Sequence, residues 1–218
     1  MKTLSPAELV RRLERTLARP DATRRDIEQL CAEARAQGFH GVCVGGSRVE
    51  LARTLLEDSE VKVTALVGFP LGAADADAKR YETEVAVDHG AQEIETVLNI
   101  GRLKDGDRRY VLRELRDIAE AADERSVKVI LETGLLTPEE RVLACQLVLE
   151  SGVHCVCTGT GLGSAATAAD VQSLRAAVGD KFGVKAAGIS DLQNALALIE
   201  AGATRLGITA AGGLMTVG

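Results

Sequence analysis

Aromatic side chains and basic charge are both scarce in this chain. Only 2% of its residues are Phe or Tyr, Trp is absent, and 32 acidic residues outnumber 26 basic ones to give a formal net charge of −6. Proteins that bind nucleic acids depend on basic patches and often on aromatic rings that stack on the bases. We therefore expect no nucleic-acid partner.

Long apolar runs are also missing. No stretch reaches the roughly 20 apolar residues that a membrane-spanning helix needs, and the N-terminal segment has no apolar block like that of a secretory signal. The five cysteines are an odd number without disulfide-like spacing, which fits a reducing compartment. Together these absences predict a cytoplasmic protein that makes no contact with membranes.

The residues that are present favour one globular domain. With 218 residues, 46% of them hydrophobic, the chain is long and apolar enough for a sizeable core. Short apolar segments alternate with longer amphipathic ones in units of about 30 residues, a pattern typical of a parallel sheet covered by helices. The expected strands are 41–44, 61–68, 93–99, 127–133, 153–158, 182–187 and 205–209.

Capping signals and glycine stops mark the helices between these strands. Ser5 opens a capping box, and the segment after it is predicted to stay helical through Leu17. Ser190 is expected to cap the last helix. The other expected helices are 21–37, 47–57, 74–88, 107–124, 137–151 and 167–178.

Charged residues distinguish an open sheet from a closed barrel. Glu93, Lys128 and Lys185 lie inside otherwise buried strand patterns, and the central strands of an open sheet would bury those charges at high cost. A barrel can gather them in one polar site at the C-terminal ends of its strands. The strand pattern by itself leaves both architectures open, and these charges favour the barrel.

Five segments, in this order along the chain, form a specific set of motifs. They are 67–72 (Val-Gly-Phe-Pro-Leu-Gly), 90–94 (Gly-Ala-Gln-Glu-Ile), 127–133 (Val-Lys-Val-Ile-Leu-Glu-Thr), 184–186 (Val-Lys-Ala) and 202–207 (Gly-Ala-Thr-Arg-Leu-Gly). With these motifs the chain resembles the deoxyribose-phosphate aldolase family, class I aldolases with a TIM-barrel fold, over nearly its whole length. The resemblance also implies a first strand near residues 12–16, where the helical pattern predicts helix. Together with the charged strands, it predicts an α/β fold, a single-domain (β/α)8 TIM barrel over residues 1–218 with a short N-terminal helical extension.

The resemblance implies a set of site residues. In that family a sixth-strand lysine forms a Schiff base with the aldehyde, a seventh-strand lysine lowers its pKa, and a fourth-strand aspartate and a fifth-strand lysine assist proton transfer. Here Lys185 and Lys128 match the seventh- and fifth-strand lysines, and Glu95 replaces the aspartate. Cys157 stands at the Schiff-base position, and Glu14 replaces the aspartate of a first-strand Asp-His-Thr motif. The candidate catalytic residues are therefore Lys185, Glu95, Lys128 and Cys157.

Each of these candidates has an alternative, purely structural interpretation. Cys157 is either an apolar filler or a nucleophilic thiol whose thiolate Lys185 would stabilise. Lys185 is either an active-site amine or one half of a salt bridge to Glu95 or Glu132, and a neighbouring Glu95 would raise its pKa. Lys128 and Glu132 lie on one face of their strand and could neutralise each other. No metal site is expected, because the cysteines have no matching histidine or cysteine cluster.

Glycine-rich loops follow the last three strands. TIM barrels commonly bind phosphate in such loops through backbone amides. We therefore expect Gly161, Gly188, Gly207 and Thr209 to contact the substrate and its phosphate, and we expect no cofactor.

Three functions stay open at this point. The first is a deoxyribose-phosphate-aldolase-like carbon–carbon lyase for a small, phosphorylated aldehyde or sugar. The second is a diverged barrel enzyme with another reaction, such as a cyclisation, an isomerisation or a thiol-dependent step. The third is a non-catalytic homologue that binds a metabolite. The expected partner is a small-molecule substrate, and a homodimer is left open.

Overall fold

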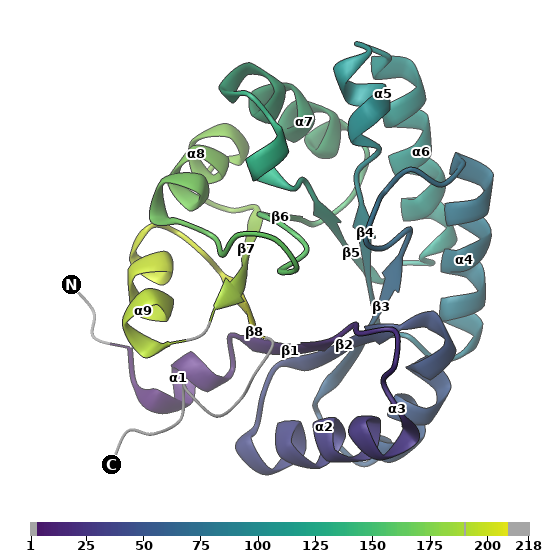
Figure 1. Ribbon diagram of the computed structural model, residues 1–218, viewed down its shortest axis with the longest axis vertical. Helices are drawn as coiled ribbons and strands as arrows, with labels where there is room; N and C mark the ends of the chain where they lie inside the picture. The colour runs from purple at the N-terminus through teal and green to yellow at the C-terminus, as the bar shows by residue number, and fades with distance from the viewer. Residues whose placement is uncertain (1–3, 190, 209–218) are drawn as a thin grey trace.

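Eight parallel strands close into a barrel in the computed structural model, which describes residues 4–189 and 191–208 (Figure 1). The strands are hydrogen-bonded in chain order, and β8 returns to β1, where Glu14 lies beside Gly207. The (β/α)8 TIM barrel is confirmed. The strands are β1 Leu13–Leu17, β2 Gly41–Gly45, β3 Lys62–Val67, β4 Glu93–Val97, β5 Ser126–Ile130, β6 Cys155–Cys157, β7 Gly183–Ile189 and β8 Arg205–Ile208.

The helices form an outer ring around the strands (Figure 1). Within the described part of the chain, none of them combines the length and the hydropathy that crossing a membrane requires. The α-helices are α1 Pro6–Val10, α2 Arg24–Gln37, α3 Val49–Leu55, α4 Ala76–Asp88, α5 Ile100–Lys104, α6 Arg108–Ala121, α7 Pro138–Glu150, α8 Ala168–Val178 and α9 Leu192–Glu200. Two short 3-10 helices are η1 Gly46–Arg48 and η2 Thr133–Leu135.

Side-chain caps determine where several helices begin. Thr137 accepts a hydrogen bond from the backbone N–H of Glu140, whose carboxylate accepts one from the N–H of Thr137, and Pro138 holds the first helical position of α7. Thr167 forms the same reciprocal pair with Asp170 at the start of α8. These capping boxes satisfy backbone donors that have no partner inside the helix, so both predicted helix starts are confirmed.

The predicted helix through Leu17 is wrong beyond Val10. α1 ends at Val10, and Leu13–Leu17 is strand β1, as the family resemblance implied. A short segment takes its structure from its neighbours when they offer hydrogen bonds on both sides. β1 has β2 on one side and β8 on the other, which overrides its local helical pattern.

Two further helix boundaries differ from the prediction. α5, capped by Asn99, falls inside a stretch that had been assigned to a strand end and a loop. The N-cap of α9 is Asp191, whose side chain accepts from the N–H of Asn194, so the capping role predicted for Ser190 is wrong. Ser190 itself and Thr209, the predicted end of the last strand, lie outside the described residues.

Apolar side chains occupy two separate regions. The large core lies between the barrel and the helices, where strand residues such as Val63 and Ile94 meet the helix layer. A smaller cluster lies elsewhere, where Val97, Ile130 and Cys157 pack with Phe69. Most TIM barrels fill their interior with layers of branched aliphatic side chains. Here charged side chains take much of that space.

One ion pair is fully buried in the helix layer. The ammonium of Lys79 on α4 lies 2.8 Å from the Glu114 carboxylate on α6 and donates to the carbonyl of Val97 at 2.8 Å. Neither side chain is exposed at all. The pair therefore joins two helices to the C-terminal end of β4.

Glu114→Leu should lower the free energy of unfolding by about 3–5 kcal/mol, because it leaves a buried ammonium without its counter-charge. The double variant Lys79→Met/Glu114→Leu should be more stable than this single variant, since it removes both charges. Urea unfolding followed by circular dichroism measures both. A double variant that loses as much as the sum of the two single variants would contradict this interpretation.

Candidate active site

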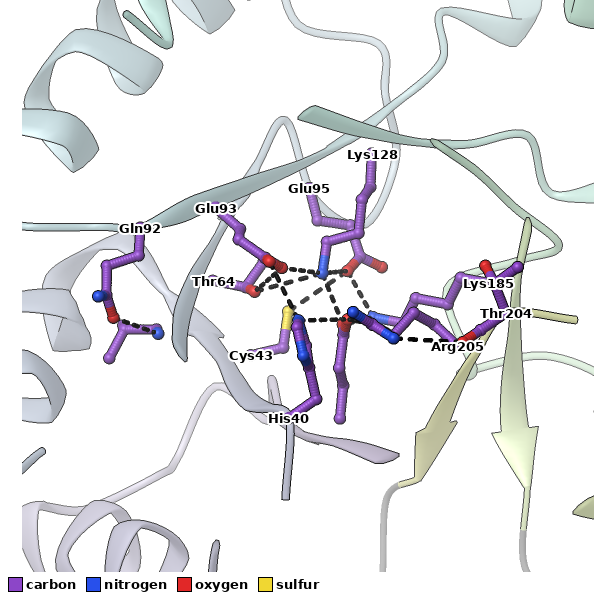
Figure 2. A network of polar contacts seen from close by, with 12 residues as sticks. His40, Cys43, Thr64, Gln92, Glu93, Glu95, Lys128, Lys185, Thr204 and Arg205 are labelled. Carbon is purple, nitrogen blue, oxygen red and sulfur yellow. Dashed lines mark hydrogen bonds and ion pairs between the residues drawn. The ribbon is translucent and has the colours of Figure 1, made fainter. Parts of the chain in front are cut away.

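A network of charged side chains fills the middle of the barrel (Figure 2). Lys128 from β5 and Lys185 from β7 approach the same centre from different strands, and both are buried. They face Glu93 and Glu95 from β4 and Glu14 from β1. Strand register brings these residues together, because Glu95 lies directly beside Lys128 and each second residue of a strand points the same way.

The contacts in this network are short. Lys185 Nζ lies 2.5 Å from Glu95 Oε2 and 2.7 Å from Glu14 Oε2. Lys128 Nζ lies 2.6 Å from Glu14 Oε2, 2.8 Å from Glu93 Oε2 and 3.8 Å from Glu95 Oε2. A single oxygen, Glu14 Oε2, therefore accepts hydrogen bonds from both ammonium groups.

Glu14 was not predicted as a site residue. The available signal was the first-strand motif to which the resemblance assigned it, but the helical pattern around it hid the direction of its side chain. A residue inside a strand that closes a barrel points either inward or outward, and only the register with β2 and β8 decides which.

The carboxylates keep both lysines protonated. Burial by itself lowers the pKa of Lys185, but Glu14 and Glu95 outweigh it and raise that pKa well above its ordinary value. The pKa of Lys128 is raised in the same way, mainly by Glu14. Conversely, burial raises the pKa of Glu93, while Lys128 and His40 bring it down to about 2. The lysines of the network are therefore protonated, and they are paired with ionised carboxylates.

Two of the four predicted catalytic residues reach the C-terminal mouth. Glu95 and Lys185 line a pocket there with the three predicted glycines. Lys128 lines a different cavity, at the N-terminal end of the barrel. The pocket at the mouth has a volume of about 10 Å³, which is near the space that one water molecule needs. The predicted glycines are Gly161, Gly188 and Gly207.

Each of these glycines lies where a larger side chain would be strained or would press on a neighbouring group. A Cβ on Gly207 would lie 3.1 Å from Cε of Lys185, so a side chain there would press on the lysine. Gly161 and Gly188 have φ values of 75° and 78°, which suit glycine, and a Cβ on Gly188 would lie 3.2 Å from Cα of Ala165. Thr209, the fourth predicted substrate contact, lies outside the described residues.

Cys157 has an apolar environment. Its side chain is fully buried beside Val97, Ile130 and Phe69. Burial, with smaller contributions from Cys155 and Glu95, raises the pKa of the thiol well above its ordinary value. A reactive thiol needs an accessible, cation-stabilised thiolate, so this environment favours the filler interpretation over the nucleophile.

Glu132 has a different task from the one predicted. Its carboxylate accepts a hydrogen bond from the N–H of Thr160 at 2.9 Å, and it has a left-handed φ of 50°. Among the described residues it forms no ion pair with Lys128 or Lys185, so both predicted pairings with Glu132 are wrong. It holds the glycine-rich loop after β6 in place.

One group of side chains could hold a metal ion. Among the described residues, Glu14, His40 and Glu93 bring three ligand atoms within 4.8 Å of one another. This group lies away from the mouth, towards the N-terminal ends of the strands.

Comparison with known proteins gives one consistent result. The model of the DeoC/LacD aldolase family matches residues 14–204. "Deoxyribose-phosphate aldolase 1" from Bacillus licheniformis is 48% identical over 206 residues, which cover 93% of this chain and 92% of the relative. A solved structure of a putative deoxyribose-phosphate aldolase from Coccidioides immitis superposes with a TM-score of 0.91 at 32% identity, covering 95% of this chain and 84% of the other.

A second solved structure bears on assembly. The deoxyribose phosphate aldolase of Aeropyrum pernix, described as having a unique tetrameric structure, matches with a TM-score of 0.87 and 29% identity. The match covers 93% of this chain and 87% of that one.

Cys157 should resist alkylation in the native protein, because its thiol is buried and its pKa is raised. All five cysteines are free and buried, so iodoacetamide at pH 8 should modify each of them slowly until urea unfolds the chain. Peptide mass mapping over time gives the rate at each cysteine. Rapid labelling of Cys157 before the other four would restore the nucleophile interpretation.

Proposed function

Since this chain belongs to the DeoC/LacD family of aldolases, we propose that it is a carbon–carbon lyase for a small phosphorylated aldehyde or sugar. Relatives that cover over nine-tenths of the chain carry the name deoxyribose-phosphate aldolase. The observation that carries the proposal is the Lys185–Glu95 pair, an amine and a carboxylate 2.5 Å apart that line the pocket at the C-terminal mouth. TIM-barrel enzymes place their chemistry at that end.

Lys185 is the imine-forming amine in this proposal. An ammonium has no lone pair, so Nζ must first give up a proton, and Glu95 Oε2 lies close enough to accept it. The neutral amine then attacks the substrate carbonyl carbon and forms a carbinolamine. The protonated Glu95 returns its proton to the departing hydroxyl, and water leaves to give an iminium.

Glu95 acts again when the carbon–carbon bond breaks. As a carboxylate it removes the proton from the β-hydroxyl of the iminium, and the bond electrons move into the C=N group to form an enamine. The β-carbon leaves as an aldehyde. Protonation of the enamine and addition of water then release the second product and restore Lys185. One base placed beside the nitrogen can serve each of these proton transfers.

Lys128 has a supporting role in this proposal, because it holds the Glu14 carboxylate that also contacts Lys185. Its ammonium shares Glu14 Oε2 with Lys185, so it takes up part of the negative charge that would otherwise fall on Lys185 alone. Its cavity is the one at the N-terminal end, which places it outside contact with a substrate at the mouth. It supports Lys185 from within the barrel.

The loops at the mouth are proposed to hold the phosphate. Gly161 and Gly188 lie close together there, since a Cβ on Gly161 would be 3.5 Å from the backbone nitrogen of Gly188. Backbone N–H groups without nearby side chains suit phosphate oxygens. Self-association, expected as a homodimer, is part of the proposal, and the tetrameric Aeropyrum pernix relative supports an oligomer in general.

Reduction with borohydride in the presence of acetaldehyde should label Lys185, and labelling should increase as pH rises from 7 to 10. Glu14 and Glu95 raise the pKa of Lys185, so the neutral amine becomes more abundant only in alkaline solution. Glu95→Gln should shift this profile to lower pH, because it removes one of the negative charges. Peptide mass mapping locates the label.

Lys185→Met should abolish the labelling, whereas Lys62→Met, a change at an exposed strand residue, should leave it unaltered. Labelling that moves to Lys128, or that does not depend on pH, would remove Lys185 as the nucleophile.

Cleavage of 2-deoxyribose 5-phosphate by the purified protein should be weak at pH 7. With an ordinary lysine pKa, only about one amine in 2,500 is neutral at that pH, and the pKa of Lys185 is higher still. We therefore expect turnover at least about 1,000-fold below that of a family member with the sixth-strand lysine, measured side by side. Comparable turnover would contradict this prediction, because it would show that a cysteine at position 157 does not lower the rate of cleavage.

A further inference from the structure

The N-terminal end of the barrel has a cavity of its own. It has a volume of about 280 Å³, much larger than the pocket at the mouth, and Glu14, Glu93, Lys128 and Arg205 lie in its wall. The proposed reaction uses none of this space, because Lys185 and Glu95 face the other end of the barrel.

Three side chains from three strand regions meet beside this cavity. His40 directly precedes β2, and its Nε2 lies 3.1 Å from Glu93 Oε1 and 3.9 Å from Glu14 Oε1 (Figure 2). Tetrahedral coordination with metal–ligand distances of about 2.0–2.2 Å places neighbouring ligand atoms about 3.4 Å apart. The observed separations lie on either side of that value, so small side-chain movements suffice.

Lys128 contacts one oxygen atom of each carboxylate, and the second oxygen of Glu93 has a hydrogen bond with His40 Nε2 that a metal ion would replace. Lys128 bonds to the Oε2 atoms of Glu14 and Glu93, and their Oε1 atoms point towards His40. Glu14 Oε1 is buried and has no hydrogen-bond partner among the described residues. A buried carboxylate oxygen without a partner is costly, and this one is itself one of the three ligand atoms.

The charges of the side chains around Glu14 leave a net negative charge that a cation could neutralise. Three carboxylates, those of Glu14, Glu93 and Glu95, face the ammonium groups of Lys128 and Lys185, so one negative charge remains. The guanidinium of Arg205 lies 3.7 Å from Glu14 Oε1 but is one-third exposed, and it can turn towards solvent.

We propose that Glu14, His40 and Glu93 bind a divalent transition-metal ion of the zinc class, with a water molecule from the cavity as the fourth ligand. One imidazole and two carboxylates suit Zn²⁺ and Co²⁺ better than Mg²⁺ or Ca²⁺, which prefer all-oxygen sites. The ion joins β1, β2 and β4 at the end of the barrel opposite the reaction. It therefore stabilises the fold and makes no contact with the reacting atoms.

The test is a titration of the chelator-treated protein with Co²⁺, followed by visible absorption. We expect one Co²⁺ per chain with the intense d–d bands of a tetrahedral site and no sulfur-to-metal charge-transfer band, since all five cysteines are buried. His40→Ala should weaken binding by at least about 10- to 100-fold, the loss that follows removal of even an indirect metal contact. Glu93→Gln should weaken it in the same direction.

His89→Ala is the matched control, because His89 is an exposed histidine outside the group. Its Co²⁺ affinity should equal that of the unaltered protein. Thermal unfolding gives a second readout: Zn²⁺ should raise the melting temperature of the unaltered protein and the His89 variant but not that of the His40 variant. Absence of Co²⁺ binding, binding that survives His40→Ala, or binding lost in His89→Ala would each overturn the proposal. None of these outcomes depends on whether Lys185 forms an imine.

Discussion

The double hydrogen bond at Glu14 Oε2 is the interaction on which the barrel interior depends. Two ammonium groups from β5 and β7 meet on one carboxylate oxygen from β1, so three strands far apart in the chain are joined at a single point. Buried charges are tolerated only when each has close partners. Once Lys128 and Lys185 lie inside the barrel, the carboxylates of Glu93 and Glu95 are needed there as well.

Different side chains of this network face the two ends of the barrel, and Glu14 contacts side chains of both sets. Towards the C-terminal mouth it presents Lys185 and Glu95, and towards the N-terminal cavity it presents Glu93 and Lys128. Glu14 belongs to both groups. Because unscreened charges interact strongly in a dry interior, a change of charge at one end of the barrel is felt at the other through this carboxylate.

The surroundings of Cys157 suit a small, uncharged side chain. The position lies in a small apolar cluster with Val97 and Ile130, and a neutral thiol packs there without any polar partner. A lysine at this position would need a further counter-charge. The charged side chains of the barrel gather instead around Glu14 Oε2, where Lys128 and Lys185 both find a counter-charge.

The sequence by itself determined the alternation of strands and helices and the starts of several helices in this protein. Alternating patterns and capping boxes such as those at Thr137 and Thr167 predicted a parallel sheet covered by helices, and the charges inside buried strands favoured a closed barrel. Local signals act between residues a few positions apart, and they are therefore readable from the chain. The family motifs added the first strand, which the local pattern had assigned to a helix.

Only the tertiary structure decided which charges meet. Glu14 and Lys185 are 171 positions apart, and no local pattern connects them. Barrel closure through the β1–β8 register brings them together, and the same closure assigns Glu95 to the mouth and Lys128 to the opposite cavity. The partners of Glu132 were mispredicted because its backbone leaves the strand just after Ile130 and turns to the loop at Thr160. Contacts of this kind depend on register and strand ends, which a periodic pattern does not encode.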